Sequence, residues 1–206
     1  MRRRIPSWAV LLWMAALIVP PVVLALHTGW LFTVLWILGP VALIGAVFAF
    51  VVLCCPALAL VAVHERFTAL GLACLVLILG VAAPVVLVLS PDLRVRARFY
   101  VERSAFGSVV ELARQGRLAS DEYYGARLPG PLCFVSATCG VVTWTAGDGQ
   151  PVLFVPDWVG IPDDAVGYAH FTGPPGGSYD GFGLRICPRL ELADGWWWLD
   201  ACPRDG

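Results

Sequence analysis

The N-terminal part of this chain is too apolar to fold as an ordinary soluble domain. Between Ile5 and Pro91 only two side chains, Glu65 and Arg66, carry a full charge at neutral pH. A bilayer core about 30 Å thick is crossed by a helix of roughly 20 apolar residues. Buried helices of soluble proteins are usually shorter and carry a polar stripe. The sequence therefore predicts a region embedded in the lipid bilayer, which is the first expected partner.

Three uncharged stretches are long enough to cross a bilayer: Trp8–Leu26, Trp30–Val63 and Phe67–Leu89. The middle stretch has 34 residues. That is too long for one span and leaves no turn between two spans of at least about 17 residues. We therefore expect one span there, with an apolar extension at the interface. The transmembrane region is predicted to cover residues 1–91, with spans at about 8–26, 33–60 and 67–89.

Residues 92–206 form the second part of the chain and hold 24 of its charged side chains. This length suffices for one domain with its own modest core. Ten arginines against fourteen acidic residues give it a net charge of −4, and the acids concentrate after residue 127. Phosphate binding needs clustered Lys and Arg, so we expect no nucleic-acid partner.

The orientation of the chain is not decided by counting arginines, because four flank each side of the predicted spans. They are Arg2, Arg3, Arg4 and Arg66 on one side and Arg94, Arg96, Arg98 and Arg103 on the other. The first span usually dominates, and long domains translocate largely regardless of charge. The C-terminal domain also holds an even number of cysteines, as exported domains often do. We expect a multi-pass protein of the cell membrane with a cytoplasmic N-terminus and an extracytoplasmic C-terminal domain.

The C-terminal domain begins with a helical pattern and continues with short β-like runs. Phe99, Phe106 and Val109 share one apolar face at helical spacing, and Gly116 suits the helix end, so we expect a helix from about Arg98 on. Apolar residues also alternate from Leu93 to Val101, which leaves an extended start of this segment as the alternative. The Arg94-Arg96-Arg98 cluster either contacts anionic lipid headgroups or forms a solvated face. The expected strands are Leu132–Ser136, Val141–Thr145, Val152–Val155, Gly167–Phe171, Phe182–Cys187, Leu190–Leu192 and Trp196–Leu199. Short consecutive strands favour an antiparallel sheet. The predicted fold class is three transmembrane helices followed by a small α+β domain, with one helix on an antiparallel sheet.

No residue pattern in this domain predicts an active site. His170 is its only histidine and lies in a strand-like run, where a structural role is favoured. The glycine-rich run at 176–181 has Asp180 where a nucleophile elbow needs glycine. The aspartates at 157, 163, 164 and 180 match no calcium loop, and Asp is common in turns because it bonds its own backbone. We therefore predict no catalytic residue, no metal and no cofactor.

The run Trp196-Trp197-Trp198 is the most unusual feature of the domain. On a strand, the first and third tryptophans share one face and the second takes the other. In one interpretation, one face of this strand belongs to the core and the other face is an amphipathic cover over it. The other interpretation is a contact surface, since tryptophan suits half-wet interfaces. The candidate contact surface consists of Trp196, Trp197, Trp198, Asp163 and Asp164.

A hairpin and a disulfide are predicted together near the C-terminus. Asp194-Gly195 between two β-like runs indicates a two-residue type I′ turn. Such a turn places Leu192 opposite Trp197 and Cys187 opposite Cys202. Opposed strand residues have Cα atoms about 4.5–5.5 Å apart, which suits a disulfide. The other two cysteines of the domain, Cys133 and Cys139, are further disulfide candidates whose pairing the sequence leaves open. Zinc is disfavoured because no Cys-x-x-Cys pair occurs.

Three functions fit these observations. The first is an integral membrane protein whose extracytoplasmic domain binds or senses a ligand without catalysis. The second is an accessory subunit of a membrane complex, in contact with a membrane or envelope protein through its spans. The third is a membrane-anchored enzyme that uses His170 and the Asp-rich loops. Charged side chains inside spans usually mark pumps and coupled transporters, so the uncharged spans disfavour that class.

Overall fold

A computed structural model describes residues 7–36, 38–64, 67–118, 125–145, 149–160 and 164–203. The chain divides into two compact units. The first, which we call the helical unit, comprises Met1–Thr28 and Ile37–Arg94. The second, the sheet unit, comprises Gly29–Trp36 and Val95–Gly206.

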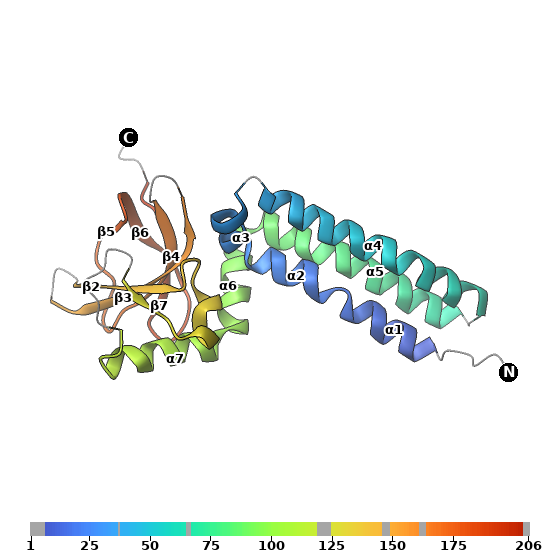
Figure 1. The fold of residues 1–206 in the computed structure, drawn as a ribbon, viewed down its shortest axis with the longest axis horizontal. Helices are drawn as coiled ribbons and strands as arrows, with labels where there is room; N and C mark the ends of the chain where they lie inside the picture. The colour runs from blue at the N-terminus through green and yellow to red at the C-terminus, as the bar shows by residue number, and fades with distance from the viewer. Residues whose placement is uncertain are drawn as a thin grey trace. The chain divides into compact units, whose positions relative to one another are not determined.

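The helical unit contains three helical stretches of membrane type by length and composition: Trp8–Leu26, Leu38–Pro56 and Leu70–Leu89. They belong to the helices α1 (Ser7–Ala16), α2 (Val19–Leu26), α4 (Leu38–His64) and α5 (Phe67–Leu89), drawn in Figure 1. The first stretch is divided because Pro20 and Pro21 cannot donate the N–H groups that would continue α1 past Ala16. The expectation of three long apolar helices is therefore confirmed.

Close packing inside the helical unit depends on a glycine. Phe50 of α4 is 2% exposed and belongs to a small cluster with Met14, Cys54 and Ala73. A Cβ added at Gly80 of α5 would overlap the Phe50 ring. Small residues let helices in a membrane approach closely, so Gly80 provides the space that the phenyl ring fills.

The 34-residue apolar stretch 30–63 is divided between two helices of the structure. A short helix, α3 (Thr28–Leu35), is followed by Trp36 with a left-handed backbone at φ 51°. Residues with a Cβ atom rarely adopt this backbone conformation, and a residue in this conformation cannot continue a right-handed helix. The long helix therefore begins at Leu38 instead of about residue 33, and α3 is part of the sheet unit.

The helical part of the C-terminal region has three pieces where one helix was expected. α6 (Pro91–Val101) and α7 (Arg103–Arg114) are separated at Glu102, and η1, a 3-10 helix, covers Gly130–Val135. The break lets Phe99 and Phe106 both contact Trp196, with ring centroids 6.3 and 4.9 Å from it. The expected strand at 132–136 was wrong, because most of this segment belongs to η1. Pro129 and Pro131 lie at the start of η1, where proline favours a helical turn.

The sheet has seven antiparallel strands in the order β1-β2-β3-β4-β7-β6-β5. They are β1 (Ala126–Arg127), β2 (Gly140–Thr145), β3 (Pro151–Val159), β4 (Ala165–His170), β5 (Tyr179–Gly181), β6 (Leu184–Glu191) and β7 (Trp196–Ala201). Trp144 of β2 stacks on Tyr179 of β5 at a centroid distance of 5.7 Å, although four strands lie between them in the sheet order. The sheet is therefore curled, and helix α7 covers its outer face (Figure 1).

The two faces of the sheet carry separate cores. Under the helices lie buried aromatic residues: Phe99, Phe106, Tyr168, Trp196 and Trp198. Inside the curl lie Phe154, Ala169, Phe182, Ile186 and Leu199. Trp196 and Trp198 are 2% and 5% exposed, so these two members of the proposed contact surface are core residues. Trp197 points to the other face, where it is half-buried against the second core.

The C-terminal hairpin has the predicted turn but not the predicted register. Asp194 and Gly195 both have positive φ, 54° and 77°, and Trp196 N–H donates to Ala193 O at 2.9 Å. These are the features of a type I′ turn. Leu192 N–H also donates to Trp196 O, at 3.0 Å, so that the strand before the turn contains one extra residue.

A second bulge lies between Pro188 and Leu190, so the register shifts twice by one residue. As a result Trp197 faces Glu191 instead of Leu192, and Cys187 faces Asp200 instead of Cys202. The predicted pairing of residues across the hairpin was therefore wrong.

Both cysteine pairs of the sheet unit nevertheless form disulfides. Cys187 and Cys202 are joined with a Cα–Cα distance of 4.9 Å, and Cys133 and Cys139 with 4.3 Å. The first bond is diagonal across the hairpin, because Cys202 lies past the end of β7. The N–H of Cys202 donates to Arg185 O of β6 at 2.9 Å, which keeps Cys202 near Cys187.

We predict that peptide mapping of the non-reduced, alkylated protein will recover Cys187 linked to Cys202 and Cys133 linked to Cys139. The three cysteines of the helical unit, at positions 54, 55 and 74, should be recovered as free thiols. Closing a loop of about 15 residues should contribute roughly 3 kcal/mol in the chain-entropy model. Any cross-pairing between the two disulfides would contradict the fold near η1 and β6.

Candidate functional site

Three side chains form a row across the outer face of the sheet. Thr143 of β2 is paired with Leu153 of β3, and Leu153 is paired with His170 of β4. Directly opposed residues of neighbouring strands point to the same face, so the row is continuous. The strand register therefore places a hydroxyl, an apolar side chain and an imidazole next to one another, on the side that α7 covers.

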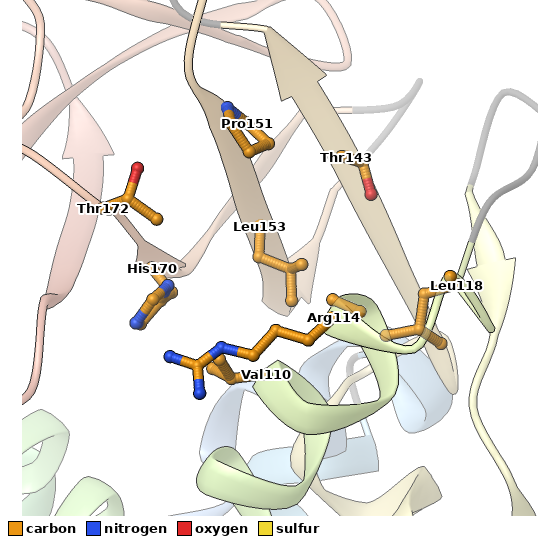
Figure 2. A pocket seen from close by; sticks show the side chains of 10 residues that line it. Val110, Arg114, Leu118, Thr143, Pro151, Leu153, His170 and Thr172 are labelled. Carbon is orange, nitrogen blue, oxygen red and sulfur yellow. The ribbon is translucent and has the colours of Figure 1, made fainter.

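A pocket of about 420 Å³ lies between this row and the C-terminal end of α7. It is lined by Val110, Ala113, Arg114, Gly116, Leu118, Thr143, Pro151, Leu153, His170 and Thr172 (Figure 2). The lining is mainly apolar, with a small number of polar groups at fixed places. Sites for small molecules usually have this composition and a volume in the range of about 300–1,000 Å³.

Arg114 and His170 are the two basic groups of the pocket, and the guanidinium of Arg114 is turned toward the imidazole in Figure 2. Burial lowers the pKa of His170, and the positive charge of Arg114 lowers it further. A hydrogen bond to the backbone of Asp194 and the charge of its carboxylate act in the opposite direction. The imidazole is therefore neutral at pH 7, and Arg114 is the charged side chain among the residues that line the pocket.

A second concentration of polar groups surrounds Arg98 in the core of the sheet unit. Arg98 is 1% exposed and forms ion pairs with Asp157 of β3 and with Glu102, the latter at 3.3 Å. Its Nη2 donates to the backbone oxygens of Phe134 and Val135 at 3.2 and 2.9 Å. Neither expected role of Arg98, contact with lipid headgroups or a solvated face, is compatible with this burial. The structure assigns it to a buried ionic cluster instead.

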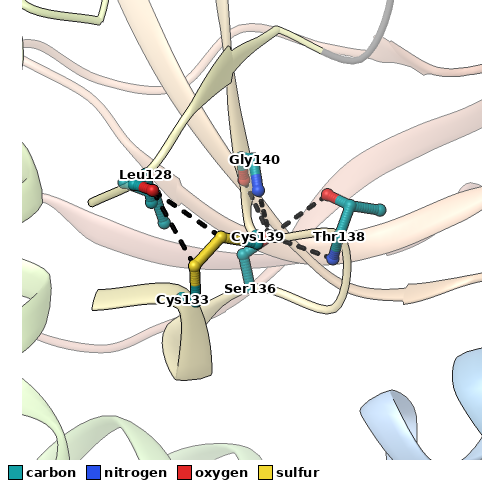
Figure 3. The surroundings of a disulfide bond; sticks show 6 residues. All are labelled: Leu128, Cys133, Ser136, Thr138, Cys139 and Gly140. Atoms are coloured by element: carbon teal, nitrogen blue, oxygen red, sulfur yellow. Dashed lines mark hydrogen bonds between the residues drawn. A yellow bond between two sulfur atoms is a disulfide. The ribbon is translucent and has the colours of Figure 1, made fainter. Parts of the chain in front are cut away.

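The disulfide between Cys133 and Cys139 closes the segment that provides those two carbonyl groups (Figure 3). Both sulfur atoms lie near the backbone oxygen of Leu128, at 3.8 and 3.7 Å. Ser136 Oγ donates to Gly140 O at 2.7 Å and ties the same segment to the start of β2. The disulfide therefore helps to hold η1 in the position from which its carbonyl groups accept hydrogen bonds from Arg98.

Helix α3 is seated on the far end of β3. Thr33 Oγ1 accepts the N–H of Val159 at 3.0 Å and donates to Gly29 O at 3.0 Å. A Cβ added at Gly29 would lie 2.8 Å from Cγ of Asp157, so only glycine fits there without displacement. Hydropathy did not separate this short helix from the long helix that follows, because apolar residues run through both of them.

The other predicted site residues are dispersed. Asp163 lies outside the described residues. Asp164 is half-buried in the connection between β3 and β4, where its backbone oxygen accepts the N–H of Gly160 at 2.6 Å. Asp180 Oδ1 accepts the N–H of Gly183 at 2.6 Å, which is the turn role expected for such residues. Within the described part of the chain, no group of three His, Cys, Asp or Glu side chains is placed to hold a metal ion.

No protein-family model, curated protein or solved structure matches this chain. The function is therefore argued from the geometry of the pocket and of the buried ionic cluster. The pocket could not be found from the sequence, because its residues come from four separate stretches of the chain that the sheet register and the packing of α7 bring together. The only hint was His170, the single histidine of the domain.

We predict that Arg98→Met will lower the free energy of unfolding of the sheet unit by about 3–5 kcal/mol, because it leaves buried carboxylates without their cation. The matched control is Arg96→Met in the same helix. Arg96 is exposed and donates to Glu191 O, so its replacement should cost less than about 1 kcal/mol. Denaturation of the full chain in detergent, followed by near-UV circular dichroism, measures both. Equal losses for the two variants would contradict the buried cluster.

We predict that the imidazole of His170 will titrate below the usual value of about 6.5 in an NMR titration. Arg114→Gln should move the pKa of His170 upward, because one of the two lowering causes is removed. Since the unfolded chain takes up this proton first, His170 should reduce stability as pH falls from about 6.5 to its folded pKa. A titration that Arg114→Gln leaves unchanged would show that the two side chains do not face each other.

Proposed function

We propose that this chain is an integral membrane protein with a cytoplasmic N-terminus, whose sheet unit lies outside the cytoplasm and binds a small ligand without catalysis. Three helices of membrane type support the anchoring. Two disulfides support a non-reducing compartment for the sheet unit. The seat of α3 on β3 fits three spans, because the segment between the first two spans and the C-terminal domain then lie on the same side of the membrane in either orientation.

The observation that carries the binding function is the pocket between α7 and the row Thr143, Leu153 and His170. It combines an apolar lining with one cation, and a buried wall of aromatic residues supports it from behind. The ring of His170 lies against that of Trp196, with centroids 5.3 Å apart. Because Trp196 is a core residue, the imidazole is held by rigid packing, as a preformed binding site requires.

Binding fits the pocket better than acid–base catalysis does. A Ser/His/Asp arrangement needs a nucleophile next to the histidine and a carboxylate on its other side. The described lining residues provide His170 with the hydroxyls of Thr143 and Thr172. The carboxylate of Asp194 acts on the charge of His170, but both its oxygens accept hydrogen bonds from Arg103, at 2.8 and 2.9 Å. The hydroxyl of Thr172 already donates to Gln150 Oε1 at 2.6 Å. The polar groups are therefore arranged to orient a ligand.

The topology is tested by fusions to alkaline phosphatase, which is active only outside the cytoplasm. A fusion after Gly206 should be active, and the same fusion after Arg66 should be inactive. The reverse pattern would place the sheet unit in the cytoplasm, where its disulfides would not persist.

The binding function is tested by ¹⁹F NMR with a mixture of fluorinated acids, amines and neutral compounds and the full chain in lipid nanodiscs. We expect at least one compound to bind wild type and to lose binding in Ala113→Trp, because the indole fills the pocket. Ala201→Trp is the control variant, since Ala201 is exposed at the end of β7. If no compound distinguishes wild type from Ala113→Trp, the pocket is not a binding site. The accessory-subunit function would then take precedence.

A further inference from the structure

We infer that the pocket between α7 and the sheet takes an apolar small molecule bearing a single carboxylate. The carboxylate pairs with Arg114, and the apolar part lies against Leu153 and the apolar face of α7. This inference rests on the proposed binding function and adds the chemical class of the ligand.

Arg114 is placed to pair with the carboxylate of a ligand. It lies at the C-terminal end of α7, and its side chain is turned over the pocket toward His170 (Figure 2). A guanidinium presents N–H groups in a planar fork that matches the two oxygens of a carboxylate. A ligand whose carboxylate lies at the opening of the pocket would be bound by the guanidinium of Arg114 through both carboxylate oxygens.

The charge of the pocket matches a ligand with one negative charge. Burial and Arg114 keep His170 neutral at pH 7, so the pocket residues present one positive charge to a ligand. One cation is complemented by one anion, whereas a phosphate monoester would bring a second negative charge without a partner. A neutral imidazole can still donate or accept one hydrogen bond. His170 therefore orients the ligand and does not attract it by charge.

Beyond the two basic groups, the lining of the pocket is mainly apolar. Val110, Ala113, Leu118, Pro151 and Leu153 provide apolar walls from the helix, the segment after it and β3. A small polar anion would leave these walls in contact with water. An apolar group attached to the carboxylate removes them from water, and the gain grows with the apolar area buried. Each added methylene should tighten binding about fourfold until the pocket is full.

The test uses the full chain in lipid nanodiscs with a matched set of probes: 4-(trifluoromethyl)phenylacetate, the corresponding amide and the corresponding phenethylamine. Empty nanodiscs provide the correction for partition into lipid. We expect the acid to bind at least about tenfold more tightly than the amide, because a charge-assisted bidentate pair is replaced by a neutral contact. We expect no binding of the amine, which would place a cation beside Arg114.

Variants show whether Arg114 is the cause. Arg114→Gln should weaken binding of the acid about tenfold or more and leave the amide unchanged. The matched control is Arg189→Gln, since Arg189 is an exposed arginine of β6 outside the pocket. Raising the salt concentration should weaken binding of the acid only in proteins that retain Arg114, because the ion pair between Arg114 and the carboxylate is near solvent.

Two outcomes would overturn the inference while the proposed function stands. One is equal affinity for acid and amide in wild type. The other is a compound of another charge class that Ala113→Trp excludes while the acid does not bind. If Ala113→Trp changes the binding of no compound, the proposed function fails together with the inference. Loss of acid binding in both Arg114→Gln and Arg189→Gln would also overturn the inference, because the effect would then be nonspecific.

Discussion

The guanidinium of Arg98 places a full positive charge in the core of the sheet unit, and the arrangement of the elements around it follows from the need to compensate that charge. Moving an ion from water into a protein interior costs several kcal/mol unless partners surround it. The partners come from three places: Glu102 at the break between α6 and α7, Asp157 on β3, and the carbonyl groups of η1. The charge is compensated only when all three are in place. The cluster therefore specifies how the helices sit on the sheet.

Strand β3 connects the features that this arrangement produces. Leu153 lies on the floor of the pocket, Asp157 pairs with Arg98, and Val159 donates its N–H to Thr33 of α3. A bulge between Pro156 and Trp158 separates the pocket end of the strand from the end that seats α3. The same strand therefore contacts the proposed ligand, the buried charge and the loop between the first two helices of membrane type.

Hydropathy over about 20 residues identified the three apolar helices, because a bilayer imposes one length on all of them. The Asp194-Gly195 turn was also readable, since few residues accept positive φ at both central positions. The bulges beyond it were not, and they moved Cys187 away from the position opposite Cys202. Arg98 was misread because a charged residue off an apolar face is normally exposed, and its partner Asp157 looked like one of several turn aspartates. The pocket could not be predicted either, because the strand register that brings its residues together is not readable from the sequence.

The seat of α3 gives the chain a fixed order of assembly. Thr33 is synthesised early, yet the N–H group that it accepts belongs to Val159, which lies 126 positions later. The contact between α3 and β3 can therefore form only after β3 has been made. A fragment that begins after the last apolar helix would leave Asp157 and Val159 uncovered at this edge. Completion of the C-terminal fold thus depends on a short segment that lies between two helices of membrane type in the sequence, so a change that displaces α3 also leaves the sheet unit incomplete.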